Sequence, residues 1–251
     1  MEKEIISASI VTYNNGDTAY EICSELVKKT GKYNLKLYVF DNASSDDTVE
    51  KIKKISGISV FENQSNLGFG SAHNGVLSKE MGKYHFVINP DIMISDDILS
   101  KMADFMEENP EVVMAMPKIL NTDGTEQFLP KEVPNFKYLF LGRLSEKIRA
   151  DYIWQGKKIT QPTDVDFCTG CFFCIRSDVF KKLGGFDERY FMYMEDADLT
   201  LRAKKYGRVV MVPNISVTHE WERTSAKNIK YLMIHIFSAF KFFLRKRGLL
   251  K

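Results

Sequence analysis

The chain has 251 residues, of which 44% are hydrophobic and 27% charged, and its formal net charge is +2. This size and composition are typical of one large globular domain, or of a domain with an appendage. Basic residues are not in the marked excess that nucleic-acid binding requires, so we expect no nucleic-acid partner.

Neither end of the chain resembles a targeting or spanning segment. Met1 to Glu4 is charged rather than apolar. The longest apolar stretch, Tyr231 to Leu244, is interrupted by polar residues and is shorter than the ~20 residues of a membrane span. Together with four cysteines, which we expect to be free thiols, these features predict a cytoplasmic protein.

Cys168, Cys171 and Cys174 have a spacing that permits a metal site. A structural zinc site needs four ligands, usually as two separated pairs, and Cys23 is distant in sequence. The segment 167–175 is apolar and is typical of a buried strand. We therefore favour small core residues over metal ligands for these thiols.

In residues 1–116, short apolar strands alternate with amphipathic helices. The helices are expected to open near Asp17, Asp46, Ser71 and Asp96. The strands are expected at Ile6–Val11, Leu35–Phe40, Ile58–Phe61, Tyr84–Ile88 and Val112–Met116. This alternation predicts a doubly wound, mostly parallel α/β sheet with helices on both faces.

The pattern changes after Pro117. A hairpin turn is expected at Asn121–Gly124, and residues 127–162 lack clean periodicity apart from a short helix near Tyr138–Ile148. A last short strand is expected at Ile215–Thr218. We divide the chain into a first half at 1–116, a second half at 117–224 and a C-terminal helix at 225–251.

Polar clusters follow three of the expected strands, at Thr12–Asn15, Asp41–Ser45 and Asn89–Asp91. In a parallel sheet, ligands bind at the carboxyl ends of the strands. The placement of these clusters therefore predicts a binding site before any motif is considered.

Several short segments form an ordered series along nearly the whole chain: Ile10–Asn14, Phe40–Asp46, Asn66–Gly70 with Asn74, Asn89–Asp91, Gly170–Phe173, Gly184–Glu188, Tyr193–Leu199 and His219. Taken together and in this order, they resemble the family 2 inverting glycosyltransferases of the GT-A fold, especially their bacterial rhamnosyltransferase-like branch. The resemblance makes residues 1–116 the nucleotide-sugar-binding half and residues 117–224 the acceptor-binding and catalytic half.

The resemblance implies a nucleotide-sugar site in the first half. Asp41 would accept the N3–H of uracil or thymine, since a carboxylate is purely an acceptor, and Thr12 and Tyr13 would flank the base. The alternative for Asp41 is a turn residue that caps the next helix, a role that we favour for Asp46. The other expected contacts to the donor are Asn14, Asn42, Asn66, Gly68, Phe69, Asn74 and Asn89.

The resemblance also implies a divalent metal, Mg²⁺ or Mn²⁺, on the diphosphate. The family usually carries two aspartates after its fourth strand, whereas this chain has Asn89 and Asp91. One carboxylate with phosphate and water ligands is sufficient to hold Mg²⁺. His219 is expected as a further metal ligand or a diphosphate contact, and Arg223 as a phosphate contact.

Glu195 and Asp196 resemble the catalytic pair of the family. An inverting transferase needs one base to take the proton of the attacking hydroxyl, and we choose Asp196 over Glu195 for that role. An acidic helix start that offsets the helix dipole is the alternative for both residues and for Asp198.

The segment from Lys227 to Lys251 has seven basic residues and no acidic one, among many apolar residues. A basic amphipathic helix of this kind is typical of peripheral contact with an anionic membrane. The alternative is a helix that packs on the catalytic domain or on a second subunit of a homodimer.

The sequence therefore predicts metal-assisted transfer of a sugar, first of all L-rhamnose from dTDP-L-rhamnose, to a surface polysaccharide or lipid-linked glycan. Other UDP or dTDP sugars, namely glucose, galactose, N-acetylglucosamine and galactofuranose, stay open as donors. A sugar nucleotidyltransferase is an alternative, although strand one leads to Thr12–Asn15 rather than to a glycine-rich triphosphate loop. A non-catalytic nucleotide-sugar-binding protein is a second alternative, but it would have no need of Asp91, Glu195 and Asp196 together.

Overall fold

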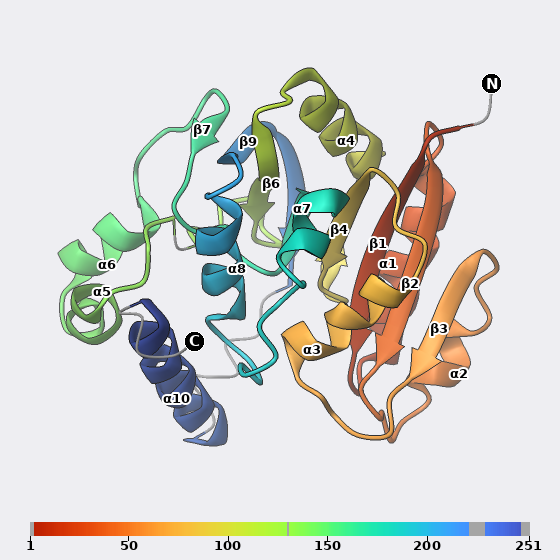
Figure 1. Cartoon of the computed structure of the whole chain (residues 1–251), viewed down its shortest axis with the longest axis horizontal. Helices are drawn as coiled ribbons and strands as arrows, with labels where there is room; N and C mark the ends of the chain where they lie inside the picture. The colour runs from red at the N-terminus through yellow and green to blue at the C-terminus, as the bar shows by residue number, and fades with distance from the viewer. Residues whose placement is uncertain (1–2, 130, 221–228, 247–251) are drawn as a thin grey trace.

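The computed structural model describes residues 3–129, 131–220 and 229–246. Its centre is a nine-stranded sheet in the order β3-β2-β1-β4-β8-β6-β9-β5, with β7 paired to β9. In Figure 1, α3 and α7 lie in front of this sheet, and α1 and α2 lie behind it. The predicted α/β architecture is confirmed.

The first half is the parallel part of the sheet. β1 (Ile5–Thr12) pairs in parallel with both β2 (Asn34–Asp41) and β4 (Tyr84–Ile88), and β2 pairs with β3 (Ile58–Glu62). Their side chains are buried on both faces, as in Ile6, Ala8 and Ile10. The connecting helices are α1 (Gly16–Lys29), α2 (Thr48–Ile52), α3 (Phe69–His73) and the 3-10 helix η1 (Asn74–Ser78).

Local chemistry sets where these helices begin. Asp46 Oδ1 accepts the amide of Thr48, the first residue of α2, at 3.1 Å. Asp97 accepts the amide of Ser100 at 3.1 Å and caps α4 (Ile98–Glu108). The helix predicted from Ser71 instead begins at Phe69, where the positive φ of Gly68 ends the preceding loop.

The second half adds strands of mixed direction. β8 (Phe172–Arg176) is antiparallel to both β4 and β6 (Val112–Leu120), and β9 (Arg208–His219) is parallel to β6. β5 (Ile92–Met93) and β7 (Thr163–Asp164) run antiparallel to β9 at the edge of the sheet. Two helices complete this half, α7 (Ser177–Lys182) and α8 (Glu195–Ala203).

The reversal at β8 decides what meets at the site. Because β8 runs against β4 and β6, its amino end lies beside their carboxyl ends. The amide of Asn89, just past β4, accordingly donates to the carbonyl of Cys171 at 2.8 Å. His219 reaches the same edge, since β9 runs parallel to β6.

The aperiodic segment 127–162 is partly helical. It contains α5 (Phe136–Phe140), the 3-10 turn η2 (Leu141–Arg143) and α6 (Glu146–Ile153). The single helix predicted near Tyr138–Ile148 is therefore wrong in detail. Ser145 caps a separate helix by accepting the amide of Ile148 at 3.5 Å, which divides the segment.

The C-terminal helix α10 (Ile229–Lys246) packs against α8 and the loop before it (Figure 1). Ser238, Ala239 and Phe242 are its buried residues, and Phe242 joins a small apolar cluster with Tyr152, Tyr190 and Met194. Within the described ranges, no helix combines the length and hydropathy that crossing a membrane requires.

All four cysteines are buried, unpaired thiols. Burial raises the pKa of Cys171 to about 12, so the thiol stays protonated. The described residues hold no group of three or more His, Cys, Asp or Glu side chains arranged for a metal ion. These features agree with a core role for the cysteines.

Candidate active site

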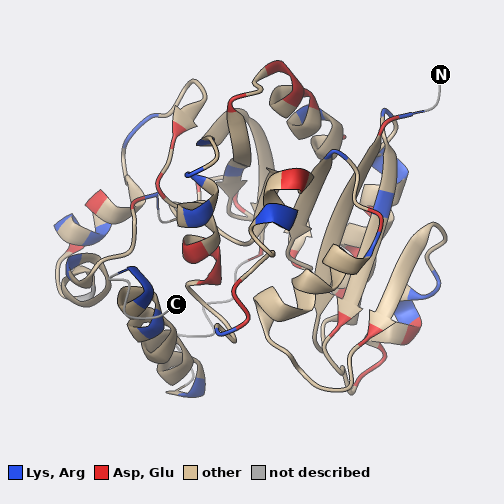
Figure 2. Cartoon of the chain, viewed as in Figure 1, with Lys and Arg blue, Asp and Glu red and all other residues tan. Residues whose placement is uncertain are grey.

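The acidic start of α8 lies near the middle of the molecule (Figure 2). Asp196 Oδ2 accepts the amide of Gly170 at 2.9 Å, and its Oδ1 accepts the amide of Ala197 at 2.8 Å. Glu195 is buried, and its Oε2 has no hydrogen-bond partner within the described part of the chain.

The two carboxyl groups have different protonation properties. Burial raises the pKa of Asp196 to about 6, although the amides of Gly170 and Ala197 favour its charged form. Burial, and then the neighbouring charge of Asp196, raise the pKa of Glu195 well above its ordinary value. Asp196, with a pKa of about 6, is therefore largely charged at neutral pH, whereas the raised pKa of Glu195 favours its neutral form.

These residues line a cleft of about 820 Å³ between the sheet, the 127–153 segment and α10. Five of the predicted site residues lie on its wall: Phe69, Asn89, Glu195, Asp196 and His219. Other parts of the wall are apolar or aromatic, including Leu139, Tyr152, Phe167, Met192 and Tyr193. Such a wall with few polar groups is typical of a substrate site.

Asp91 and His219 lie side by side at the carboxyl ends of β4 and β9. His219 Nε2 is 3.3 Å from Asp91 Oδ2. On its other side, His219 Nδ1 is 2.8 Å from Gln127 Oε1, and Gln127 Nε2 donates to Asn121 Oδ1 at 3.0 Å. Gln127 Nε2 also donates to the backbone carbonyl of His219 at 3.4 Å, which can only accept, so Gln127 Oε1 faces His219 and Nδ1 donates to it.

In neutral His219 the lone pair of Nε2 consequently faces a carboxylate. Asp91 Oδ1 and His219 Nε2 are both buried and make no hydrogen bond to any described residue. Two acceptors that face one another without a proton between them repel each other, and a bound cation would remove this repulsion. The pair fits a divalent metal, with Gln127 holding the imidazole in the ligating tautomer.

The nucleotide-binding residues predicted in the first half meet at the carboxyl ends of β1 and β2. Thr12 Oγ1 donates to Asp41 Oδ1 at 2.8 Å, and the amide of Ser44 donates to Asp41 Oδ2 at 2.8 Å. Asp41 is thus both a turn residue and a buried carboxylate that keeps some acceptor capacity. Tyr13 projects beside it and is 48% exposed.

Asparagines join the neighbouring loops. Asn14 Oδ1 accepts the amide of Ser45 at 2.8 Å. Asn42 Nδ2 donates to the carbonyl of Gly68 at 3.0 Å, and Asn66 Oδ1 accepts the amide of Gly68 at 2.9 Å. The loops after β1, β2 and β3 therefore form one hydrogen-bonded rim.

A close backbone contact connects this rim to the catalytic half. Gly68 has φ +85°, and a Cβ at this position would lie 2.1 Å from the carbonyl oxygen of Phe191. The amide of Phe69 donates to the same oxygen at 2.9 Å. Only glycine allows the two loops to approach this closely.

Asn74 lies away from the cleft. Its Nδ2 donates to the backbone carbonyl of Phe186 at 2.9 Å, and its Oδ1 accepts from the backbone amide of Phe186 at 2.8 Å. It therefore holds the loop before α8 in place, and we give it a positioning role rather than the predicted donor contact. Arg223 lies outside the described residues.

Gln127 and Gly170 contact the candidate site residues His219 and Asp196, and sequence reasoning missed both. Gln127 lies in a segment without periodicity, so no local pattern marks it. Gly170 carried a signal, because it lies in one of the matching segments. Its contact to Asp196 depends on a strand reversal that no motif shows. Asp198, by contrast, pairs with Arg202 at 2.7 Å.

A nucleotide-type parallel half, a carboxylate at the floor of the cleft and an Asp–His pair at the sheet edge together define a glycosyltransferase of the GT-A fold. The chain belongs to glycosyl transferase family 2, whose model matches residues 7–184.

Two curated relatives are rhamnosyltransferases. The chain is 25% identical over 244 residues to N-acetylglucosaminyl-diphospho-decaprenol L-rhamnosyltransferase of Mycobacterium tuberculosis, covering 90% of this chain and 79% of the relative. It is 29% identical over 196 residues to rhamnosyltransferase WbbL of Escherichia coli, covering 72% and 71%.

A solved structure supports the fold. GalNAc-T7, crystallised with UDP, GalNAc and Mn²⁺, superposes with a TM-score of 0.68 at 18% identity. The match covers 88% of this chain and 44% of that one, so this chain spans less than half of its length.

Proposed function

We propose that the enzyme transfers L-rhamnose from dTDP-L-rhamnose to a hydroxyl of a lipid-linked glycan or surface-polysaccharide precursor, with inversion at the sugar. The observation that carries the proposal is Asp196, a charged carboxylate held by two backbone amides on the wall of a large cleft. Donor and acceptor follow the names of the two rhamnosyltransferase relatives.

Asp196 acts as the general base. The acceptor hydroxyl attacks C1 of the donor sugar from the face opposite the diphosphate, and the C1–O bond to phosphate breaks. The hydroxyl proton passes to Asp196, and the nucleoside diphosphate leaves. A carboxylate with a pKa of about 6 is charged at neutral pH and still basic enough for this task.

The nucleoside diphosphate binds on the rim of the first half. Asp41 accepts the N3–H of thymine or uracil, with Tyr13 against the base. Thr12 and Ser44 support this role, because their hydrogen bonds hold the carboxylate in one orientation. The asparagine-linked loops then shape the ribose and sugar site.

Asp91 and His219 hold a divalent cation, Mg²⁺ or Mn²⁺. When bound, the cation neutralises charge on the leaving diphosphate. The chain supplies a carboxylate and an imidazole lone pair, which Gln127 orients.

The outer side of α10 provides a peripheral membrane contact. Met233, Ile236, Phe237 and Phe240 are large apolar side chains there that are 40–61% exposed. Lys230 and Lys241 flank them on the same helix. Apolar side chains between cations suit an anionic lipid surface, which is where a lipid-linked acceptor resides.

A transfer assay against a panel of nucleotide sugars tests the function. We expect rhamnosyl transfer from dTDP-L-rhamnose to an N-acetylglucosamine acceptor on a diphosphate lipid. Transfer from a different UDP or dTDP sugar alone would keep the enzyme class and change the donor. Formation of a nucleotide sugar from sugar phosphate and nucleoside triphosphate, with no transfer, would overturn the proposal.

A further inference from the structure

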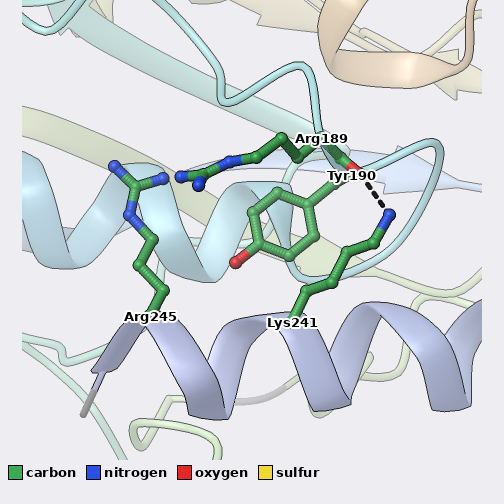
Figure 3. Close-up of a pocket in the computed structure, with 4 residues that line it drawn as sticks. All are labelled: Arg189, Tyr190, Lys241 and Arg245. Carbon is green, nitrogen blue, oxygen red and sulfur yellow. Dashed lines mark hydrogen bonds between the residues drawn. The ribbon is translucent and has the colours of Figure 1, made fainter. Parts of the chain in front are cut away.

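A second, smaller pocket of about 190 Å³ lies outside the cleft, between the loop that follows Phe186 and α10. It is lined by Arg189, Tyr190, Lys241 and Arg245 (Figure 3). The guanidinium groups of Arg189 and Arg245 point toward one another, and Tyr190 lies between the helix positions of Arg245 and Lys241. Three cationic side chains therefore line one hollow.

The surroundings of the pocket leave it positive. Arg189 Nη2 lies 2.6 Å from Asp187 Oδ2, and Arg245 contacts Asp187 as well as Asp198. Asp198 is also paired with Arg202 at 2.7 Å. Among the residues that the structure describes, the cations of these ion pairs and of the pocket wall, Arg189, Arg202, Arg245 and Lys241, outnumber the carboxylates Asp187 and Asp198.

Glu188 is the acidic residue next to Arg189 in the chain. Its Oε1 accepts from the side-chain amide of Asn74 at 3.1 Å, away from the pocket. The ammonium group of Lys241 donates to the carbonyl of Arg189 at 2.6 Å, which uses one of its three donors. A ligand with several anionic oxygens matches these donors, and arginine in particular suits phosphate.

The pocket is a near neighbour of the catalytic cleft. Arg189 and Tyr190 line the pocket, while Met192 and Tyr193 of the same loop line the cleft. On α10, Lys241 lies six residues after His235 of the cleft wall, about 9 Å at 1.5 Å per residue. A monosaccharide and its linked phosphate can bridge a separation of this size.

Exposed apolar side chains of α10 are the third feature of this region, beside the cleft and the cationic pocket. Phe237 and Phe240 lie between His235 and Lys241 in α10 and are 59% and 61% exposed. Sugar-binding cleft, cationic pocket and exposed apolar side chains are thus adjacent on one helix. This is the chemistry of a sugar joined through phosphate to a hydrocarbon chain.

We infer that the pocket of Arg189, Lys241 and Arg245 binds the diphosphate of a lipid-linked acceptor, while the sugar of that acceptor lies in the cleft beside Asp196. The inference rests on the proposed function and adds a recognition site for the acceptor. In this inference, the three cations make the enzyme prefer an acceptor whose lipid is linked through phosphate over an acceptor with a neutral lipid.

Direct binding tests the pocket without any transfer reaction. The probe is farnesyl diphosphate, titrated by calorimetry in EDTA so that no divalent cation can recruit it to Asp91 and His219. We expect the full chain to bind it, and Lys241→Gln and the double variant Arg189→Gln/Lys241→Gln to bind at least about tenfold more weakly, the effect of a lost charge-assisted hydrogen bond. Lys28→Gln, at an exposed position of α1 remote from the pocket and from α10, should bind as the wild type does. Equal binding by all four proteins, or no binding by the wild type, would overturn the inference.

Kinetics with paired acceptors test the role in recognition. With N-acetylglucosamine on a diphosphate lipid, Lys241→Gln should raise KM about tenfold and leave kcat unchanged. With the same sugar on a neutral alkyl chain, wild type and variant should have equal KM. A rise in KM for both acceptors would mean that the cations only fasten α10, which contradicts the inference.

Vesicles separate the acceptor from bulk lipid. If Lys241→Gln weakens binding to phosphatidylglycerol vesicles but not to farnesyl diphosphate, the pocket contacts membrane headgroups and the inference is wrong. If the wild type transfers no sugar from any donor, the proposed function fails, and farnesyl diphosphate binding still decides whether the pocket binds a lipid diphosphate.

Discussion

The backbone amide of Gly170 donates to Asp196 Oδ2 at 2.9 Å and so connects the amino end of β8 to the first turn of α8. The contact holds the carboxylate toward the cleft and favours its charged form against the cost of burial. One hydrogen bond between segments 26 residues apart thus contributes to both the position and the basicity of the proposed base.

Replacing each member of the acidic pair should identify the base. Asp196→Asn should lower kcat by about 10²-fold or more, because the amide cannot accept the hydroxyl proton. Glu195→Gln should retain most activity, since Glu195 Oε2 is buried without a hydrogen-bond partner among the described residues and its raised pKa favours the neutral form. Calorimetry of donor binding is the control and should give near wild-type affinity for both. An active Asp196→Asn beside an inactive Glu195→Gln would reverse the assignment.

The pH profile should follow the same carboxylate. We expect kcat/KM to fall below about pH 6, approaching a tenfold loss per pH unit, as Asp196 becomes protonated. The measurement is initial rate against pH with saturating metal and nucleotide sugar. A flat profile down to pH 5 would exclude Asp196 as the titrating base.

Glu195 should reduce stability at neutral and alkaline pH. Its pKa is raised in the folded state, so above its ordinary pKa the unfolded chain loses a proton that the folded chain keeps. Glu195→Gln should therefore increase the free energy of unfolding by about 1 kcal/mol or more at pH 8. At pH 4 the gain should disappear, because the carboxyl is then protonated in both states. Urea titrations at the two pH values measure the difference, and a gain that is equal at both would contradict this explanation.

Gly68 should resist substitution for two separable reasons. Gly68→Ala places a Cβ 2.1 Å from the Phe191 carbonyl oxygen in a backbone with φ +85°. Gly124 has φ +82°, but a Cβ there would meet no atom within 4 Å, so Gly124→Ala is the matched control for backbone strain alone. We expect a loss of about 1 kcal/mol for Gly124→Ala and of about 2 kcal/mol or more for Gly68→Ala. Equal losses in thermal unfolding would show that the contact with Phe191 is unimportant.

Gln127 should tune the metal through His219. Gln127→Leu removes the acceptor that holds Nδ1–H, and Mn²⁺ affinity in the presence of dTDP should fall about tenfold. Asp91→Ala should lose most of the binding, and Gln161→Leu, at an exposed position, should change nothing. Mn²⁺ titrations followed by electron paramagnetic resonance give these affinities without an activity assay. Wild-type affinity in Asp91→Ala would remove the metal assignment.

The sequence alone determined the architecture of the first half and the types of residue at the site. Alternating apolar strands and capped helices specify a parallel sheet, because continuous apolar strands must be buried on both faces. Asp41, Asp91 and Asp196 were predicted because each belongs to a segment that matches the family or follows a strand at its carboxyl end.

Only the tertiary structure decided which of these residues work together. β8 enters between β4 and β6 in reverse, a long-range pairing that local periodicity does not encode, and this brings Gly170 to Asp196. The sequence predicts Asn74 as a contact to the nucleotide sugar. Its side-chain amide is instead hydrogen-bonded to the backbone of Phe186, which lies 112 residues further along the chain. Gln127 has no sequence signal because its role depends on the position of His219, 92 residues away, and such contacts are set by how the strands pack rather than by neighbours in the chain.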